Sequence, residues 1–206
     1  MVKVQGLTKR LGKCVLFRKL DFVWDNPEII CITGANGAGK TSLLSLLAGV
    51  IQPDAGEIFI LGEDLLDKSH DLMQQIAYVP DNCPVYSFIS GGEWLSFVKS
   101  LRAFDPELEE ELLAGFGLVP YLNCQFGEMS LGTSRKFLLT SALMCHTSLV
   151  ILDEPSNGLD NTSFDFLCLH LEQRKSESLI VLSCLDVHQQ IQLGARTIEL
   201  CSLERS

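Results

Sequence analysis

The sequence predicts an α/β domain with a mainly parallel sheet, and two observations lead to this class. Short β-type runs alternate with longer helical patterns, as in sheets whose parallel strands are joined by helices. Two of the runs, Ile29–Thr33 and Leu149–Leu152, are apolar on both faces, which is typical of central strands covered by helices on both sides. The length of 206 residues, at about 150 residues per domain, favours a single domain over residues 1–206.

The expected elements follow one another along the whole chain. Strands are expected at residues 14–17, 29–33, 57–61, 76–79, 149–152, 179–183 and 197–200. Helices are expected after Gly39 and at residues 91–102, 106–116, 133–146 and 161–174. Asp105, Pro106 and Glu107 mark one helix start clearly, with a capping carboxylate, a proline at the first position and an acid in the first turn.

Composition and charge exclude two classes of protein. Hydrophobic residues make up 47% and charged residues 20% of the chain, which is typical of a globular core and not of a disordered chain. Sixteen Lys and Arg against 26 Asp and Glu give a formal net charge of −10. Without a basic cluster this charge repels nucleic-acid phosphates, so we expect no nucleic-acid partner.

The sequence also indicates where the protein works. Its first residues lack the charged start, apolar stretch and cleavage site of a secretory signal, so we expect it to stay in the cytoplasm. Apolar runs such as 43–51 and 179–182 are far shorter than the roughly 18 to 20 residues that cross a bilayer, so membrane contact is expected only through a partner. The eight cysteines form no Cys-x-x-Cys pair, and we interpret them as reduced, buried thiols.

A phosphate-binding loop is the strongest motif. Residues 34–41 read Gly-Ala-Asn-Gly-Ala-Gly-Lys-Thr, which matches G-x-x-x-x-G-K-[ST] between a predicted strand and a predicted helix. The glycines let successive backbone N–H groups approach the β-phosphate, and the helix adds the positive end of its dipole. Lys40 would bridge the β- and γ-phosphates, and the Thr41 hydroxyl would bind Mg²⁺. The expected nucleotide-binding residues are Gly34, Asn36, Gly37, Ala38, Gly39, Lys40, Thr41 and Ser42.

Two acids, Asp153 and Glu154, follow the apolar run 149–152. Burial of this run draws the strand inward and brings Asp153 to its carboxyl end, where ligands bind in open α/β sheets. Asp153 is expected to orient Mg²⁺ through its water shell, and Glu154 to polarise the attacking water as general base. Glu154 and Lys40 are therefore the expected catalytic residues. A solvated acidic strand end is the alternative for this segment taken alone.

With these motifs in this order, the chain resembles the ATP-binding cassette (ABC) ATPases over nearly its whole length. Residues 129–133, Met-Ser-Leu-Gly-Thr, are similar to the family's L-S-G-G-Q signature and lie about twenty residues before Asp153; taken alone they are equally typical of a plain helix cap. Residues 156–160, Ser-Asn-Gly-Leu-Asp, are similar to the family's D-loop. Residues 34–58 and 78–80 are most similar to single-cassette bacterial exporters, including the small haem-exporter ATPase of cytochrome c maturation.

The resemblance implies a fold and a working cycle. The fold is that of a P-loop NTPase with an N-terminal antiparallel β part and a helical subdomain at about residues 83–132. Two cassettes, copies or different proteins, would enclose ATP and Mg²⁺ head to tail. The Walker loop of each would face Ser130, Leu131, Gly132 and Thr133 of the other, and Asp160 would reach across. A separate membrane permease would receive the motion through the helical subdomain, at the cytoplasmic face of the inner membrane.

Three positions depart from the family pattern. Asp81 replaces the Q-loop glutamine, and its carboxylate can approach Mg²⁺ but cannot donate to the lytic water. Leu185 replaces the switch histidine and offers the γ-phosphate no hydrogen bond, while His188, one turn on, is more typical of a core or surface residue. Leu11 replaces the aromatic that stacks on adenine, which would weaken base binding by about 1 to 3 kcal/mol. We therefore expect slow unaided hydrolysis.

Three functions are compatible with these residues. The leading one is the ATP-hydrolysing subunit of a membrane transporter, bound to a separately encoded permease. A soluble ABC protein acting on ribosomes or DNA is disfavoured by the acidic balance. A nucleotide-dependent dimerising module with little or no hydrolysis is favoured by Asp81 and Leu185.

Overall fold

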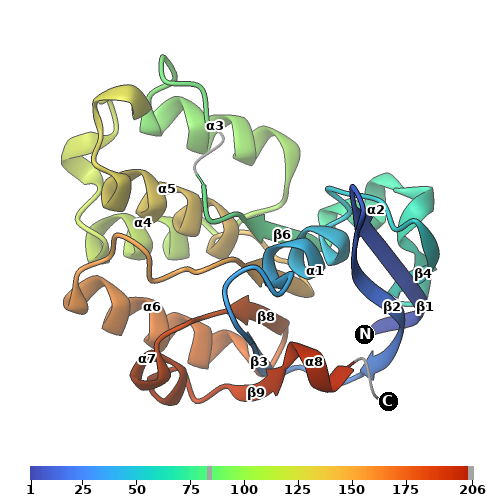
Figure 1. Ribbon diagram of the computed structural model, residues 1–206. Helices are drawn as coiled ribbons and strands as arrows, with labels where there is room; N and C mark the ends of the chain where they lie inside the picture. The colour runs from blue at the N-terminus through green and yellow to red at the C-terminus, as the bar shows by residue number, and fades with distance from the viewer. Residues whose placement is uncertain (83–84, 204–206) are drawn as a thin grey trace.

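Two β-sheets and the helices around them make up the fold (Figure 1). The protein is described by a computed structural model, which covers residues 1–82 and 85–203. The larger sheet is parallel, which confirms the predicted α/β class. Its strands lie in the order β6 (Ile76–Val79), β7 (Leu149–Leu152), β8 (Leu179–Ser183), β3 (Ile29–Thr33) and β9 (Arg196–Glu199).

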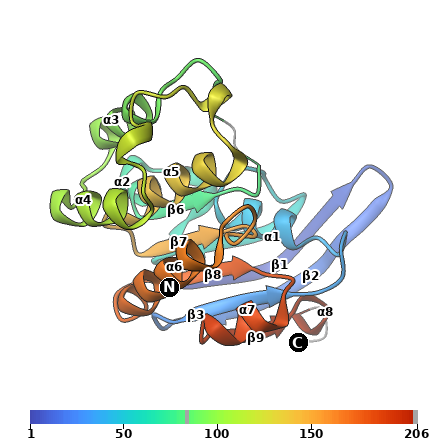
Figure 2. The same ribbon diagram turned by 90° about the vertical axis from the view of Figure 1, so that its left-hand side faces the viewer.

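An antiparallel sheet forms the N-terminal part, as the family resemblance implies. Its strands lie in the order β2 (Cys14–Trp24), β1 (Val2–Leu11), β4 (Ala55–Ile60) and β5 (Glu63–Asp64). Strands β1 and β2 form a long hairpin that extends away from the parallel sheet (Figure 2). The sequence predicted only residues 14–17 of this hairpin, because register shifts along β1 interrupt its two-residue alternation of apolar and polar side chains.

Helices surround the parallel sheet; the one predicted at 161–174 has these bounds, and the other predicted helices differ by up to three residues. The helix expected at 133–146 spans residues 131–143, because the Ser130 side chain caps it two residues earlier than expected. The predicted cap Asp105 is confirmed, since its carboxylate accepts the N–H groups of Glu107 and Leu108. The helices are α1 (Lys40–Leu47), α2 (His70–Gln74), α3 (Gly91–Leu101), α4 (Pro106–Gly115), α5 (Leu131–Leu143), α6 (Asn161–Arg174), α7 (Val187–Gln192) and α8 (Leu200–Leu203).

Helices α3, α4 and α5 lie together on the side of the molecule away from the antiparallel sheet (Figures 1 and 2). Short 3-10 helices at Leu65–Asp67, Val119–Tyr121 and Phe126–Glu128 connect other elements. Residues 83 and 84, where the helical subdomain is expected to begin, lie outside the described residues. Within the described part of the chain, none of the helices has the length and apolar character needed to cross a membrane.

The central strands bury both of their faces. In β3, Ile29 and Cys31 belong to one hydrophobic core, which also contains side chains of α5 and α6. Ile30 and Ile32 belong to the other core, which contains side chains of α1 and the antiparallel sheet. Strand β7 divides its residues in the same way, because successive side chains of a strand point to opposite faces. This packing explains the continuous apolar runs. Because β3 and β7 both pair in parallel with β8, their carboxyl ends lie at the same edge of the sheet.

The cysteines are only partly as predicted. The seven that the structure describes are thiols and not disulfides, and Cys83 lies outside the described residues. The prediction of buried thiols is wrong for Cys14 and Cys201, which are exposed, and Cys124 and Cys168 are only partly buried. Cys31 is fully buried within β3, and burial raises the pKa of its thiol to about 12.

Candidate functional site

The predicted phosphate loop connects the end of β3 to the start of α1. Gly39, the last residue before the helix, has a φ of 105°, and a Cβ atom there would lie 3.0 Å from Cζ of Phe17. Glycine is therefore required both by the backbone conformation and by the close packing against β2. The Lys40 ammonium group donates to the loop carbonyls of Gly34 at 3.0 Å and Ala35 at 3.3 Å. The lysine is thus held over the loop, with 7% of its surface exposed.

Asp153 and Glu154 lie at the carboxyl end of β7, at the same edge of the sheet as the phosphate loop. Asp153 is 1% exposed, and its Oδ1 accepts a hydrogen bond of 2.6 Å from the Ser183 hydroxyl. Its Oδ2 is buried and has no hydrogen-bond partner among the described residues. A buried carboxylate oxygen without a partner is costly unless it faces a cation or an ordered water, so this atom fits a metal ligand.

The chemistry of the donors fits Mg²⁺ better than a transition metal. Across residues 1–82 and 85–203, no group of three or more His, Cys, Asp or Glu side chains is placed to hold a metal ion. Mg²⁺ is commonly bound by one or two protein oxygens together with substrate phosphates and water. The Asp153 carboxylate and the exposed Thr41 hydroxyl, which follows Lys40 at the end of the loop, match that requirement.

The pKa of the Glu154 carboxyl is raised above its ordinary value, mainly because burial disfavours the charged form. The negative charges of Asp153 and Asp81 raise this pKa further, whereas the charge of Lys40 and a hydrogen bond from the backbone of Leu185 lower it. Glu154 has a φ of 45°, a left-handed conformation that is uncommon for a residue other than glycine. A carboxylate with a raised pKa, beside a phosphate loop, has the properties of a general base.

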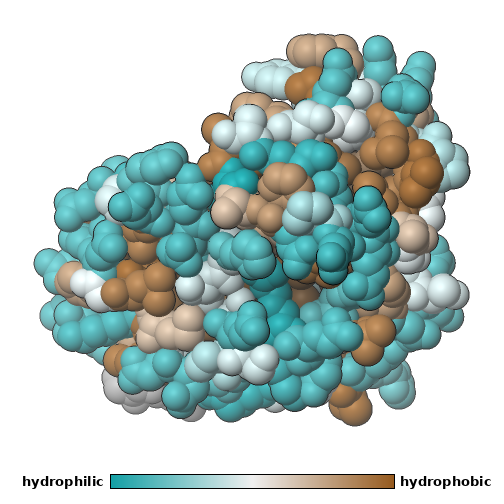
Figure 3. Space-filling view, turned by 180° about the vertical axis from the view of Figure 1, so that it is seen from behind, coloured by the Kyte–Doolittle hydropathy of each residue, from teal (hydrophilic) through white to brown (hydrophobic). Residues whose placement is uncertain are grey.

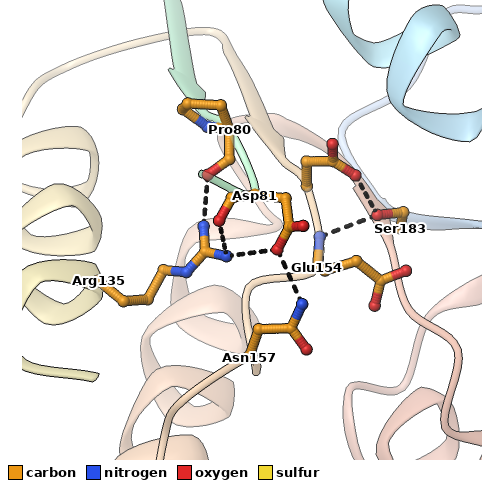
Figure 4. A network of polar contacts seen from close by, with 7 residues as sticks. Pro80, Asp81, Arg135, Glu154, Asn157 and Ser183 are labelled. Carbon is orange, nitrogen blue, oxygen red and sulfur yellow. Dashed lines mark hydrogen bonds and ion pairs between the residues drawn. The ribbon is translucent and has the colours of Figure 1, made fainter. Parts of the chain in front are cut away.

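Asp81 is held by two side chains that sequence analysis did not identify (Figure 4). Its Oδ1 accepts hydrogen bonds from Nη2 of Arg135 at 2.9 Å and from Nδ2 of Asn157 at 2.8 Å. Arg135 is 2% exposed and also donates to the carbonyl groups of Asp81, at 2.7 Å, and Pro80. One carboxylate therefore joins the end of β6, helix α5 and the D-loop, residues 156–160.

The segment similar to the signature packs against the D-loop of the same chain. The Ser130 hydroxyl accepts the N–H of Thr133 at 3.1 Å and so caps α5, while Leu131 is 58% exposed. A Cβ atom on Gly132 would lie 2.2 Å from the Gly158 carbonyl oxygen, so only glycine fits there. Asp160 caps α6, and hydrogen bonds from Ser163, with Lys136 adding to them, lower its pKa to about 2.

Comparison with known proteins identifies the family of the chain. The family model described as ABC transporter matches residues 17–157. The chain belongs to the ABC transporter family. It is 30% identical over 206 residues to the cytochrome c biogenesis ATP-binding export protein CcmA of Escherichia coli O157:H7, and the match covers 100% of this chain and 98% of that protein. The chain is thus an ATP-binding subunit of the ABC transporter type, and the ABC ATPases hydrolyse ATP.

Solved ABC structures share the fold. The structure of an ATP-binding subunit of an ABC transporter matches with a TM-score of 0.83 and 26% identity, over 92% of this chain and 81% of that one. A dimeric bacterial ABC transporter cassette, MJ0796, matches with a TM-score of 0.82 over 93% of this chain and 91% of that one. At 18% identity the second match shows the fold alone.

The three departures from the ABC pattern differ in their surroundings. Leu185 is 51% exposed, and its backbone, not its side chain, contacts the Glu154 carboxylate. His188 is exposed on α7 and donates its own backbone N–H to Asp186. Leu11, at the end of β1 in the hairpin, is 55% exposed. The Asp81 side chain, in contrast, accepts hydrogen bonds from Arg135 and Asn157.

Arg135, Asn157 and Ser183 are the residues of this ABC site that sequence analysis missed. Only Ser183 had a local signal, because it is the polar end of an otherwise apolar strand. Arg135 lies 54 residues from Asp81 and Asn157 lies 76 residues from it, so no local pattern joins them.

Replacement of Gly132 by alanine is expected to lower the free energy of unfolding by about 1 to 3 kcal/mol, because the added methyl group overlaps the Gly158 carbonyl and displaces the D-loop. Urea unfolding of the purified chain measures this loss. Leu131→Ala, on the exposed neighbour, is the control, with an expected change within about 0.5 kcal/mol. Equal midpoints for Gly132→Ala and the unsubstituted chain would contradict the close packing of signature and D-loop.

Proposed function

We propose that the chain is the Mg²⁺-dependent ATP-hydrolysing subunit of a single-cassette exporter, of the kind to which CcmA belongs. The observation that carries this proposal is the placement of the phosphate loop and the Asp153–Glu154 pair at one edge of the parallel sheet. The charge of Lys40 lowers the pKa of Glu154, so the residue proposed to hold the phosphates lies within electrostatic range of the proposed base. The full-length match to CcmA supports the export role.

Each residue has a defined part in the proposed reaction. The loop residues Gly34, Asn36, Gly37, Ala38, Gly39 and Ser42 surround the phosphates, and Lys40 neutralises their charge. Thr41 and Asp153 would hold Mg²⁺, which offsets the charge that develops on the phosphate oxygens, and Asp81 remains a predicted further ligand. Glu154 takes a proton from the attacking water, for which its raised pKa suits it.

A second cassette is part of the proposal. Ser130, Leu131, Gly132 and Thr133 would face the nucleotide of that cassette, and Asp160 would lie at the same interface. The exposed positions of Ser130 and Leu131 at the start of α5 support this placement, because nothing in the described part of the chain covers them. Dimeric cassettes among the solved relatives of this fold agree with the arrangement.

The second proposed partner is a membrane permease, bound on the surface of helices α3 to α5. Apolar side chains gather on the part of the back surface that lies over α3 to α5 (Figure 3). Exposed large apolar residues of α3 to α5 and of the chain just before α3 are Tyr86, Phe88, Phe97, Leu101, Val119, Tyr121 and Leu131. Apolar surface of this kind is typical of protein contacts. Binding to a permease through this surface would place the chain on the cytoplasmic face of the inner membrane.

We further propose that unaided hydrolysis is slow. The Leu185 side chain cannot donate a hydrogen bond to a γ-phosphate, and loss of one such donor commonly costs about 10²- to 10³-fold in rate. The Asp81 carboxylate has no hydrogen to donate to the lytic water. A nucleotide-dependent dimerising module is therefore the second candidate function, and it predicts ATP-dependent dimers without release of phosphate.

Calorimetric titration with Mg-ATP tests the binding on which the proposal depends. Lys40→Ala is expected to weaken binding by about 10- to 100-fold, because hydrogen bonds to a charged group contribute about 1.5 to 3 kcal/mol. The control is Lys175→Ala, which removes a surface partner of Glu172 beyond the end of α6 and should leave binding unchanged. Absence of binding heat from the unsubstituted, folded chain at millimolar Mg-ATP would refute the proposed function.

A further inference from the structure

The Ser183 hydroxyl contacts the Asp153 carboxylate and the backbone N–H of Glu154, and Figure 4 shows the contact with Glu154. Ser183 is the last residue of β8 and is fully buried. Its Oγ lies 2.6 Å from Oδ1 of Asp153 and 2.9 Å from the backbone nitrogen of Glu154. No ligand or catalytic motif assigns a task to this residue.

The direction of both hydrogen bonds follows from the number of hydrogens available. A hydroxyl group has one hydrogen to donate and two lone pairs that accept. The backbone N–H of Glu154 can only donate, so Ser183 accepts there. The single hydroxyl hydrogen is then available for Oδ1 of Asp153, which as a carboxylate oxygen can only accept. The two partners therefore fix the direction in which the Ser183 hydroxyl hydrogen points.

The strand register makes this contact possible. Strands β7 and β8 are parallel neighbours, and Leu152 is paired with Leu182, so Asp153 and Ser183 come next on adjacent strands. The chain turns sharply at Glu154, whose φ is 45°. The hydrogen bond from its N–H to Ser183 therefore holds an unfavourable backbone conformation in place.

We propose that Ser183 is a positioning residue for the reaction, an inference that rests on the proposed ATPase function. By occupying Oδ1 of Asp153, it leaves the buried and unpartnered Oδ2 as the oxygen for Mg²⁺. By accepting the N–H of Glu154, it sets the turn that carries the general base. One side chain thus orients both the metal ligand and the base without contacting the nucleotide.

Ser183→Ala tests the proposal. The measured quantity is the Mg²⁺ gain, which is the ratio of the ATP affinity with Mg²⁺ to the ATP affinity in EDTA. We expect this gain, and kcat, to fall by about 10- to 100-fold, the usual cost of removing a group that orients a metal ligand, while ATP affinity in EDTA stays unchanged. Without nucleotide and metal, the amide hydrogen of Glu154 should exchange faster in the variant. Ser183→Thr keeps the hydroxyl and should keep the Mg²⁺ gain.

Ser178→Ala is the matched control. Ser178 precedes β8 at the opposite end of the strand, is 3% exposed, and donates to the Thr147 carbonyl at 2.7 Å. This variant should lose thermal stability but keep the full Mg²⁺ gain. If Ser183→Ala behaves in the same way, the positioning role is wrong.

Two further outcomes separate the possible failures. Should Ser183→Ala fail to fold, Ser183→Cys keeps the shape of the side chain with a larger atom that is a much weaker donor. A full Mg²⁺ gain in that variant would overturn the proposal. If the unsubstituted chain shows no Mg²⁺ gain, the proposed function itself fails. A gain that survives in Ser183→Ala refutes only the role of Ser183.

Discussion

Glu154→Gln is expected to lower ATP turnover by about 10²- to 10⁴-fold, the usual contribution of a positioned general base. The amide has nearly the same shape but cannot accept the proton of the attacking water. Mg-ATP binding should stay close to that of the unsubstituted chain, because Lys40, Thr41 and Asp153 are all retained. Phosphate release at saturating Mg-ATP, measured beside calorimetric binding, separates the two effects.

Glu177→Gln, at an exposed position after α6, is the control and should leave turnover unchanged. Turnover that survives Glu154→Gln would show that another group is the base. Size measurements with and without ATP distinguish the two candidate functions, because a hydrolysing cassette should keep its ATP-bound dimer longer in Glu154→Gln. A module without hydrolysis should dimerise equally with glutamate or glutamine at this position.

Asp81→Ala is expected to lower the free energy of unfolding by about 2 kcal/mol. Breaking a buried ion pair costs about 3 to 5 kcal/mol, whereas an exposed pair contributes about 0 to 1 kcal/mol. The Arg135–Asp81 pair lies between these limits, since the side chains are 2% and 52% exposed, respectively. Without the carboxylate, Arg135 remains buried with carbonyl oxygens as acceptors but no negative charge beside it.

A double-mutant cycle checks the origin of this loss. Arg135→Met in the Asp81→Ala background should cost less than in the unsubstituted chain, with a coupling energy of about 1 to 2 kcal/mol by urea unfolding. Glu28→Ala, which breaks the surface pair with Arg196, should cost less than about 1 kcal/mol. Additive losses at Asp81 and Arg135 would show that the ion pair contributes nothing.

The position of Asp81 gives it a role that its sequence context did not indicate. The sequence indicates this carboxylate only as a substitute for the Q-loop glutamine. In the structure its Oδ1 is shared by Arg135 of α5 and Asn157 of the D-loop. If α5 moves relative to the phosphate-binding part of the molecule, either these hydrogen bonds break or Asp81 and Asn157 move with α5.

The sequence by itself determined the class of the fold and the main parts of the site. Strands β3, β6, β7 and β8 were predicted with the bounds that the structure has, because strands buried on both faces are continuous apolar runs. The phosphate loop and the acid pair are contiguous motifs, so their order and flanking elements were available locally.

Only the tertiary structure decided which distant segments contact and orient these parts of the site. Apart from residues 14–17, the β1–β2 hairpin escaped prediction because register shifts interrupt the alternation along β1. Helices α2, α7 and α8 are too short to show a helical period. Ser183 reaches Asp153 because β7 and β8 are neighbours in the sheet, although 30 residues separate them. A hydrogen bond between distant segments depends on the packing of the whole domain, and no local run of residues encodes it.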